Sequence, residues 1–352
     1  MSVFSTKLLQ WYHQQNRVLP WRDDNPDPYK VWIAEIMLQQ TTFATVANRF
    51  HDFMAVFPNL ESLAKASQAE VLQHWAGLGY YARARNLHHC AQVLVAEYHG
   101  EFPKDIKTLR TLPGIGDYTA AAIAAIAFDV SGHAIDSNIK RIFARFTRYQ
   151  QPVTERTPEL LDFFVASESG HSPRHHLQAW MDFGETLCRA RNPDCPHCPL
   201  QENCQGKDIA ETLPIKVPKK PRRQLRAYGY WLENQDGTAL WLRRRPQKGL
   251  LAGMLEIPTS DWQETSSKHV LNLPTQDWQN TEQAIQHRFT HIDLRLDIVR
   301  AKAAQETSLE DYGTESRWYP LADLSQLGLP SLMKKIVGAM DNNKVKSDHV
   351  DE

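Results

Sequence analysis

Leu112-Pro113-Gly114-Ile115-Gly116 is the stretch that decides the fold of the first half of the chain. Pro113 ends one helix and an alanine-rich helix follows, so these residues predict a tight turn between two helices. Gly114 and Gly116 allow backbone N–H groups to approach an anion at the positive end of the second helix. The stretch therefore predicts a turn that binds a phosphate, although any tight interhelical turn uses similar residues.

Helices are predicted on both sides of this turn. Asp27 and Pro28 supply an N-cap and a first-turn proline for a helix that continues to Phe43. No repeat of solenoid length is present. Residues 1–212 are therefore predicted to form one mainly α domain, with a helix-hairpin-helix at about 108–128. Further helices are expected at 60–75, 81–98, 138–149, 158–167 and 175–188.

Four of the five cysteines have the spacing C-x6-C-x2-C-x5-C; the first ends the last of these helices, and the other three lie in the proline-containing loop after it. Four thiolates bind either zinc or a [4Fe–4S] cube, and His197 is an alternative ligand. Since only the middle pair has the spacing of a zinc knuckle, we expect an iron–sulfur cluster in a loop over 188–204. Cys90, inside a helix, is expected in the core. The expected ligands are Cys188, Cys195, Cys198 and Cys204.

Composition places few limits on function. The chain has 352 residues, a formal net charge of −1 and a hydrophobic content of 42%. These values are ordinary for a soluble protein of about two or three domains. The N-terminal residues lack the apolar core of a signal peptide, and no run reaches the roughly 18 apolar residues of a membrane span. We therefore expect an intracellular protein with no membrane partner.

The pattern of hydrophobic residues changes after a basic, proline-containing segment at 213–226, which we interpret as a linker. Tyr228–Leu232 and Ala239–Leu242 flank a turn at 234–237, as in a β-hairpin. Apolar and polar residues alternate from Ile292 to Ile298, which is typical of a half-buried strand. Residues 227–340 are thus predicted to form an α+β domain, and residues 341–352 a disordered tail.

Two acidic residues have settings that suit catalysis. Glu35 lies in an apolar helical segment beside Trp32 and Ile36, which disfavours the charged carboxylate and raises its pKa. Asp136 directly precedes a predicted helix, where backbone donors and the helix dipole favour the anion. A neutral acid paired with an ionised carboxylate is the arrangement used in glycoside hydrolysis. The simpler alternatives are an ordinary helix cap for Asp136 and a partly exposed position for Glu35, and the spacing leaves open whether the two meet.

The segment GLGYYARARN, Gly77 to Asn86, places two aromatic residues and two arginines after a glycine turn. Tyr80 can stack on bases or wedge between them, while Arg83 and Arg85 can reach phosphates. The alternative is that the tyrosines belong to the core and that the arginines face solvent.

These motifs occur in one order: PW, EIMLQQT, GLGYYARARN, LPGIG, DSNIKR and then the four cysteines. The set spans Leu19 to Cys204 and resembles the endonuclease III superfamily of helix-hairpin-helix DNA glycosylases, and within it the adenine DNA glycosylase (MutY) family. The resemblance implies a base-excision-repair enzyme with a [4Fe–4S] cluster, which removes adenine mispaired with 8-oxoguanine or guanine in double-stranded DNA. It also implies a cytoplasmic monomer that acts at the nucleoid.

One position separates the two main branches of that superfamily. Glycosylase/lyases of the endonuclease III type carry a Schiff-base lysine in LPGxGxK, where this chain has Tyr118. A phenol forms no imine, so a monofunctional glycosylase is expected. QKGLLAGMLEIP (Gln247 to Pro258) and HRFTHIDL (His287 to Leu294) resemble the Nudix-like C-terminal domain of the MutY family. The acidic metal box of Nudix hydrolases does not follow Glu256, which favours lesion reading over pyrophosphate hydrolysis.

Matching the family motifs residue by residue implies a role for each residue. Glu35 would protonate adenine at N7, and Asp136 would stabilise or attack the sugar. Asn138 would orient Asp136, with Tyr118 close by. Further matches are Arg17, Trp21 and Gln178 in the adenine pocket, Gln39, Gln40, Thr41, Tyr80, Arg83, Arg85, Gly114 and Gly116 at the DNA, and Phe289, Thr290 and His291 in the lesion-reading loop.

The sequence departs from the family pattern at three places. The usual DGN is DSN, with Ser137 in place of glycine, and the loop residue that is often serine is Thr290. The tryptophans of the family's GLWGGLW are Leu251 and Leu255. Two rival functions remain at this point: an endonuclease III-like glycosylase/lyase for oxidised pyrimidines, and an iron–sulfur DNA-binding protein without catalysis.

Overall fold

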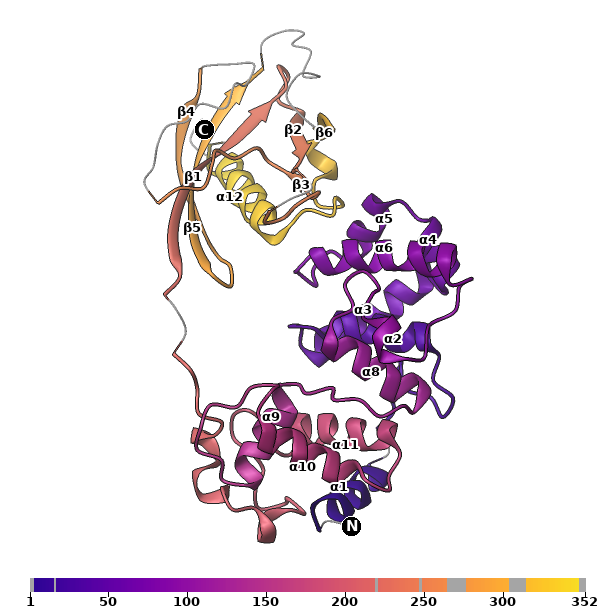
Figure 1. Cartoon of the computed structure of the whole chain (residues 1–352). Coiled ribbons are helices and arrows are strands. Elements are labelled where there is room, and N and C mark those ends of the chain that lie inside the picture. The colour runs from indigo at the N-terminus through magenta and orange to yellow at the C-terminus, as the bar shows by residue number, and fades with distance from the viewer. Residues whose placement is uncertain are drawn as a thin grey trace. The chain divides into compact units, whose positions relative to one another are not determined.

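The computed structural model describes residues 3–15, 17–218, 221–246, 249–264, 277–303 and 315–347 (Figure 1). The chain divides into two compact units, Met1–Ala66 with Asn86–Pro218 and Ser67–Arg85 with Lys219–Glu352. Ser67–Arg85 therefore groups with the C-terminal residues, although the sequence predicts it within the N-terminal domain. None of the described helices is both long and apolar enough to cross a membrane.

The first unit is built from helices, as predicted. α2 (Pro28–Leu38) begins where the sequence indicates, because the Asp27 side chain accepts a hydrogen bond from the Tyr29 N–H and Pro28 occupies the first turn. The other helices are α1 (Val3–Gln14), α3 (Phe43–Val56), α4 (Leu60–Lys65), α6 (Ala82–Glu97, which begins in the second unit), α7 (Ile106–Leu109), α8 (Asp117–Phe128), α9 (Ser137–Phe146), α10 (Pro158–Glu168), α11 (Pro173–Thr186) and the short 3₁₀ helices Gln201–Asn203 and Lys207–Thr212.

The helix predicted over 60–75 is in fact two helices. α4 ends at Lys65, Ala66 is extended, and α5 (Gln68–His74) begins anew. The Ser67 side chain accepts a hydrogen bond from the Glu70 N–H and so caps the second helix.

α8 is the central helix of the first unit. All its residues from Thr119 to Ala127 are buried, and most are alanines, whose small side chains permit close packing. α2 and α11 pack on α8, and α11 also contacts α1 and α9. This packing brings side chains of α2, α8, α9 and α11 to the wall of one cavity.

The second unit contains a six-stranded mixed sheet in the order β3-β2-β1-β5-β4, with β6 paired to β2. β1 and β2 form the predicted antiparallel pair, whereas β1 and β5 are parallel. The strands are β1 (Arg223–Glu233), β2 (Ala239–Arg244), β3 (Leu255–Glu256), β4 (Gln279–Arg288), β5 (Ile292–Lys302) and β6 (Ser316–Pro320), followed by a 3₁₀ turn at Leu321–Asp323.

Helix α12 (Ser331–Ser347) packs against this sheet through Leu332, Met333 and Ile336, which belong to the main hydrophobic cluster of the unit. α12 extends through 341–347, part of the segment predicted to be disordered. Residues 348–352 of that segment lie outside the described residues, as do Lys219 and Lys220 of the predicted linker.

Candidate active site

Glu35 lies on α2, whose residues from Val31 to Met37 are all buried. Its own exposed fraction is 6%. The Tyr118 hydroxyl donates a hydrogen bond to Glu35 Oε2 over 3.2 Å. Burial raises the pKa of Glu35 to about 7; the Tyr118 hydrogen bond opposes this rise, and the charge of Asp136 adds to it. Glu35 therefore holds a proton up to near-neutral pH, as the sequence predicts.

Asp136 caps the N-terminus of α9. Its Oδ1 accepts a hydrogen bond from the Ile139 N–H at 2.8 Å, and its Oδ2 accepts one from Asn138 Nδ2 at 2.9 Å. Burial raises the pKa of Asp136 above its ordinary value, although these donors and Arg141 lower it. The backbone donors at the helix end favour the anion, as predicted, but desolvation is the larger effect and the net direction of the pKa shift is upward. Asp136 accepts hydrogen bonds from more donors than Glu35 does, and these donors favour its charged form.

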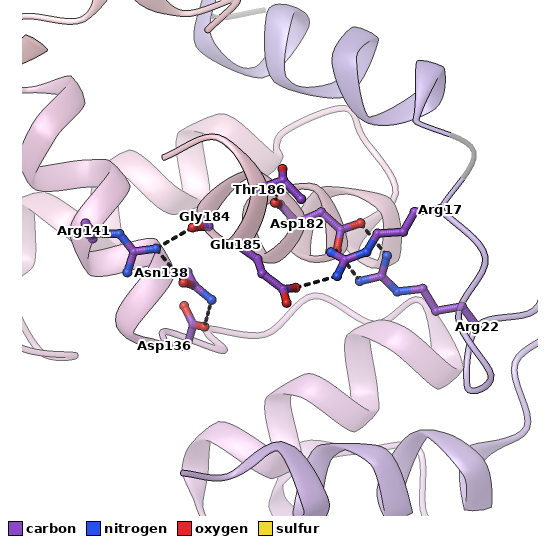
Figure 2. A network of polar contacts seen from close by, with 9 residues as sticks. All are labelled: Arg17, Arg22, Asp136, Asn138, Arg141, Asp182, Gly184, Glu185 and Thr186. Carbon is purple, nitrogen blue, oxygen red and sulfur yellow. Dashed lines mark hydrogen bonds and ion pairs between the residues drawn. The ribbon is translucent and has the colours of Figure 1, made fainter. Parts of the chain in front are cut away.

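Arg141 holds Asn138 from the next turn of α9. Its Nη2 donates to Asn138 Oδ1 and to the Gly184 carbonyl, both at 2.7 Å, and its Nε donates to the Cys188 carbonyl at 2.8 Å. Figure 2 shows these contacts leading from α11 through Arg141 and Asn138 to Asp136. A Cβ at Gly184 would lie 2.6 Å from the Asn138 Cβ, so the close approach requires glycine. Sequence reasoning missed Arg141, although it is the last residue of the DSNIKR motif.

Glu35 and Asp136 line the same cavity, whose volume is about 550 Å³. This volume is typical of sites that bind small molecules. Tyr118 and Asn138 also line the cavity, so the structure brings the four predicted catalytic residues together. The other predicted site residues in its wall are Trp21, Gln39, Gln40, Thr41 and Gln178, and Ser137 lines it as well.

Arg17 binds residues of the cavity wall. Its Nη1 lies 2.6 Å from Asp182 Oδ1, its Nη2 lies 2.7 Å from Glu185 Oε2, and its guanidinium lies 4.5 Å from the centre of the Phe43 ring. Arg22 also contacts both Asp182 oxygens, at 2.5 and 2.9 Å (Figure 2). Sequence reasoning missed Arg22, Asp182 and Glu185. The spacing of the two acids, three residues apart on α11, was the available signal.

Hydroxyl groups orient two of the predicted glutamines. The Tyr12 hydroxyl donates to Gln178 Oε1 at 2.7 Å, so the amide nitrogen of Gln178 is left to donate elsewhere. Gln39 Nε2 donates to Thr119 Oγ1 on α8 at 3.0 Å. Gln39 is followed by Gln40, whose φ of 54° turns the chain sharply after α2. The polar residues 39–41 are therefore presented at the cavity by a turn fixed on α8.

The glycine turn between α7 and α8 is formed as predicted. Gly114 has a φ of 76°, and a Cβ there would lie 2.6 Å from the Asn86 Cβ. Gly116 is the N-cap of α8 and has no side chain to cap it. A helix start without a side-chain cap suits an anion bound by backbone N–H groups, as predicted for this turn.

The predicted DNA contacts in GLGYYARARN differ in their surroundings. Tyr80 has a φ of 45° and is 48% exposed. Arg83 donates to the carbonyls of Leu78 and Gly79, and burial lowers its pKa to about 10. Arg85 donates to the Ala252 carbonyl within the second unit. Both guanidinium groups therefore bind backbone carbonyls, and the exposed aromatic ring is the group of this segment best placed to meet a partner.

The four predicted metal-binding cysteines line one small cavity. The guanidinium of Arg145 reaches the same place, with Nη1 3.4 Å from Cys188 Sγ. Arg145 is 2% exposed, and its other acceptors are carbonyl oxygens, including those of Arg189 and Ala210. Within the described residues Arg145 has no carboxylate partner, and a buried cation in this setting calls for a compensating negative charge, which four cysteine thiolates and a cluster would supply.

The predicted lesion-reading loop is the turn between β4 and β5. The Phe289 N–H donates to the Ile292 carbonyl at 2.7 Å and closes the turn. Phe289 is half-buried, whereas Thr290 and His291 are exposed. Within the same unit, the hydroxyls of Tyr80 and Thr290 lie 3.0 Å apart.

Comparisons with known proteins agree with this arrangement. Residues 33–165 match the HhH-GPD superfamily of base excision DNA repair proteins, and residues 228–339 match a NUDIX domain. The chain is 30% identical over 345 residues to the adenine DNA glycosylase of Buchnera aphidicola subsp. Schizaphis graminum. The matched region covers 95% of this chain and 98% of the relative. The chain belongs to the adenine DNA glycosylase family.

Other relatives agree with this assignment. The human adenine DNA glycosylase is 30% identical over 408 residues, covering 96% of this chain and 73% of that protein. Among solved structures, a thermostable thymine-DNA glycosylase superposes with a TM-score of 0.53 at 27% identity, covering 58% of this chain and 95% of the other. The predicted family, the helical glycosylase domain and the Nudix-like domain are thus confirmed. The endonuclease III-like alternative is not favoured.

Proposed function

We propose that this chain hydrolyses the N-glycosidic bond of adenine mispaired with 8-oxoguanine or guanine in double-stranded DNA. The observation that carries the proposal is the single cavity lined by both Glu35 and Asp136. Adenine as the excised base is supported by the names of the relatives. The mispair is proposed from the likeness of residues 287–294 to the family's lesion-reading loop.

Glu35 and Asp136 have different roles in the proposed reaction, one at the base and the other at the sugar. A base inside a duplex is out of reach, so adenine must first leave the stack at a cost of a few kcal/mol. Glu35 then gives its proton to N7, and when the C1′–N9 bond breaks the electron pair leaves with a neutral base. Asp136 stabilises the positive charge on the sugar or bonds to C1′. Water supplies the hydroxyl group at C1′, and its remaining proton returns to Glu35.

The reaction is proposed to stop at base removal. Tyr118 occupies the position of the Schiff-base lysine, and its hydroxyl donates to Glu35. Burial holds the pKa of Tyr118 well above its ordinary value, so the hydroxyl remains a donor. Among the described residues that line the cavity there is no lysine. No amine is therefore available there to form an imine with the sugar and cleave the strand.

The cysteine loop is proposed to hold a [4Fe–4S] cluster with a structural role. The fit is supported by the four sulfur ligands around one cavity and by the uncompensated Arg145. Only Cys195 and Cys198 have the spacing of a zinc knuckle, and the gaps of six and five residues beside them favour a larger group over zinc. A visible absorbance band that disappears in Cys198→Ser would support the cluster, and stoichiometric zinc would exclude it.

The decisive experiment uses a duplex with one 8-oxoguanine:adenine pair, incubated with the full chain and then treated with alkali. Strand cleavage at the adenine is expected, with none before alkali and no covalent adduct after borohydride. Glu35→Gln should lose excision but retain binding to the mispair. A duplex with 8-oxoguanine opposite cytosine is the control. An adduct trapped by borohydride, or full excision by Glu35→Gln, would overturn the proposal.

A further inference from the structure

Four side chains of the second unit form one continuous stack that ends at the lesion-reading loop. The Arg245 guanidinium lies 5.2 Å from the centre of the Trp262 ring. Trp262 stacks on Phe289, with ring centres 5.5 Å apart and planes inclined by 29°. His287 meets Phe289 edge-on, with ring centres 4.6 Å apart. The stack thus connects the strand region around residue 245 to the tip of the β4–β5 hairpin.

The end of the stack farthest from the loop is fixed in the protein core. Arg245 pairs with Glu256, whose side chain is 1% exposed and which also binds Arg243 at 2.9 Å. Arg245 Nε donates to the Leu250 carbonyl at 3.0 Å. The indole N–H of Trp262 donates to Thr259 Oγ1 at 3.1 Å. Trp262 is therefore held by a hydrogen bond and by a guanidinium that cannot readily move.

The other end of the stack lies in the lesion-reading loop, at Phe289. Thr290 and His291 are exposed; the Thr290 hydroxyl lies 3.0 Å from that of Tyr80, and the His291 carbonyl accepts from the Arg223 N–H at 3.0 Å. Phe289 precedes them in the turn and packs against the main hydrophobic cluster of the unit, together with Trp262. Because three consecutive residues form the turn, a fixed Phe289 ring restricts the two residues that follow it.

We propose that Trp262 is a positioning residue for recognition of the base opposite the adenine. By stacking on Phe289, it holds Thr290 and His291 in the orientation that distinguishes 8-oxoguanine from guanine. The inference rests on the proposed function. Leu251 and Leu255, which replace tryptophans of the family pattern, pack on the same hydrophobic cluster as Trp262. The inference therefore gives a role to the indole that this chain does have beside that cluster.

The test compares single-turnover excision of adenine opposite 8-oxoguanine with excision opposite guanine, using the full chain. Trp262→Ala should lower the ratio of the two rates about three- to tenfold, the effect expected from loss of one aromatic pair. Trp262→Phe should restore the ratio. The matched control is Trp278→Ala, which removes an indole packed on Tyr230 in the other hydrophobic cluster of the unit and should leave the ratio unchanged.

An unchanged ratio in Trp262→Ala would overturn the inference. If that variant does not fold, Trp262→Leu keeps bulk without a ring, and equal ratios for Trp262→Leu and Trp262→Phe would also overturn it. A Thr290→Ala/His291→Ala double variant separates this inference from the proposed function. If the double variant leaves the ratio unchanged, lesion reading by this loop fails; if it lowers the ratio and Trp262→Leu does not, only the role of Trp262 fails.

Discussion

Glu35 in the first unit and Glu256 in the second are both buried glutamates with opposite surroundings. Among the residues that the structure describes, Glu35 accepts its hydrogen bond from the neutral hydroxyl of Tyr118. Glu256 binds the guanidinium groups of Arg243 and Arg245. Burying a carboxylate without a cation costs free energy, whereas a paired carboxylate can join strands. The uncompensated acid is therefore the one expected to do chemistry, and the compensated acid is expected to stabilise the fold.

The largest expected effect concerns the proton on Glu35. Because its pKa is raised to about 7 and the proposed reaction needs the protonated form, single-turnover excision should fall about tenfold for each pH unit above that value. Glu35→Gln should lower the rate by about 10²- to 10⁴-fold and abolish this dependence on pH. Rates measured on both sides of neutral pH provide the check. The same alkaline decline in a residually active Glu35→Gln variant would assign it to another group.

The second prediction concerns the two arginines that pair with Glu256 in the second unit. Arg243→Met combined with Arg245→Met leaves Glu256 buried and unpaired, so the second unit should lose about 3–5 kcal/mol of unfolding free energy. Urea unfolding followed by circular dichroism measures the loss. The matched control is Arg223→Met, which breaks the exposed pair with Glu264 and should cost less than about 1 kcal/mol. Equal losses in the two variants would contradict the contrast between buried and exposed pairs.

Features that depend on neighbouring residues could be predicted from the sequence. The Asp27 cap of α2 and the turn between β1 and β2 formed where local patterns placed them. α3 (Phe43–Val56) was missed because no cap or breaker in its sequence was recognised as a helix start, although the Thr42 side chain caps it by accepting from the Thr45 N–H.

Features that depend on packing could not be predicted in this way. Arg17 and Asp182 lie 165 residues apart in the chain, so their ion pair has no local signal. Arg141 reaches across to α11 in the same manner. The direction of the Asp136 pKa depends on how deeply the end of α9 is buried, which is a property of the assembled helices. The motifs predicted residues that the structure places around one cavity, whereas the direction of the Asp136 pKa shift required the packed helices.

The third prediction concerns how much the ionised form of Glu35 lowers the free energy of unfolding. The ordinary pKa of glutamate is 4.5, and in the folded chain that of Glu35 is about 7. The proton on Glu35 therefore stabilises the fold fully below pH 4.5, and this contribution is lost as the pH rises through 7. Since glutamine cannot ionise, Glu35→Gln should unfold less readily than the unmodified chain above pH 7, by up to about 3 kcal/mol. Urea unfolding at acidic and alkaline pH tests this, and a difference that does not shrink toward pH 4.5 would contradict it.

The smallest expected effect concerns the packing of Gly184 against Asn138, the residue that donates a hydrogen bond to Asp136. Gly184→Ala places a Cβ 2.6 Å from the Asn138 Cβ, so Asn138 must move relative to Asp136. Excision should fall about 10- to 100-fold, because small misplacements of catalytic groups are costly. Binding to the mispair should persist.

The matched control for that variant is Gly338→Ala on α12, where a Cβ would meet nothing within 4 Å. It should stabilise the helix by about 0.5–1 kcal/mol and leave excision unchanged. Full excision by Gly184→Ala would mean that Asp136 acts without the help of Asn138. In that case the Ile139 N–H and Arg141 would be enough to stabilise the buried carboxylate of Asp136. The comparison of the two units would then concern only the unpaired Glu35 and the paired Glu256.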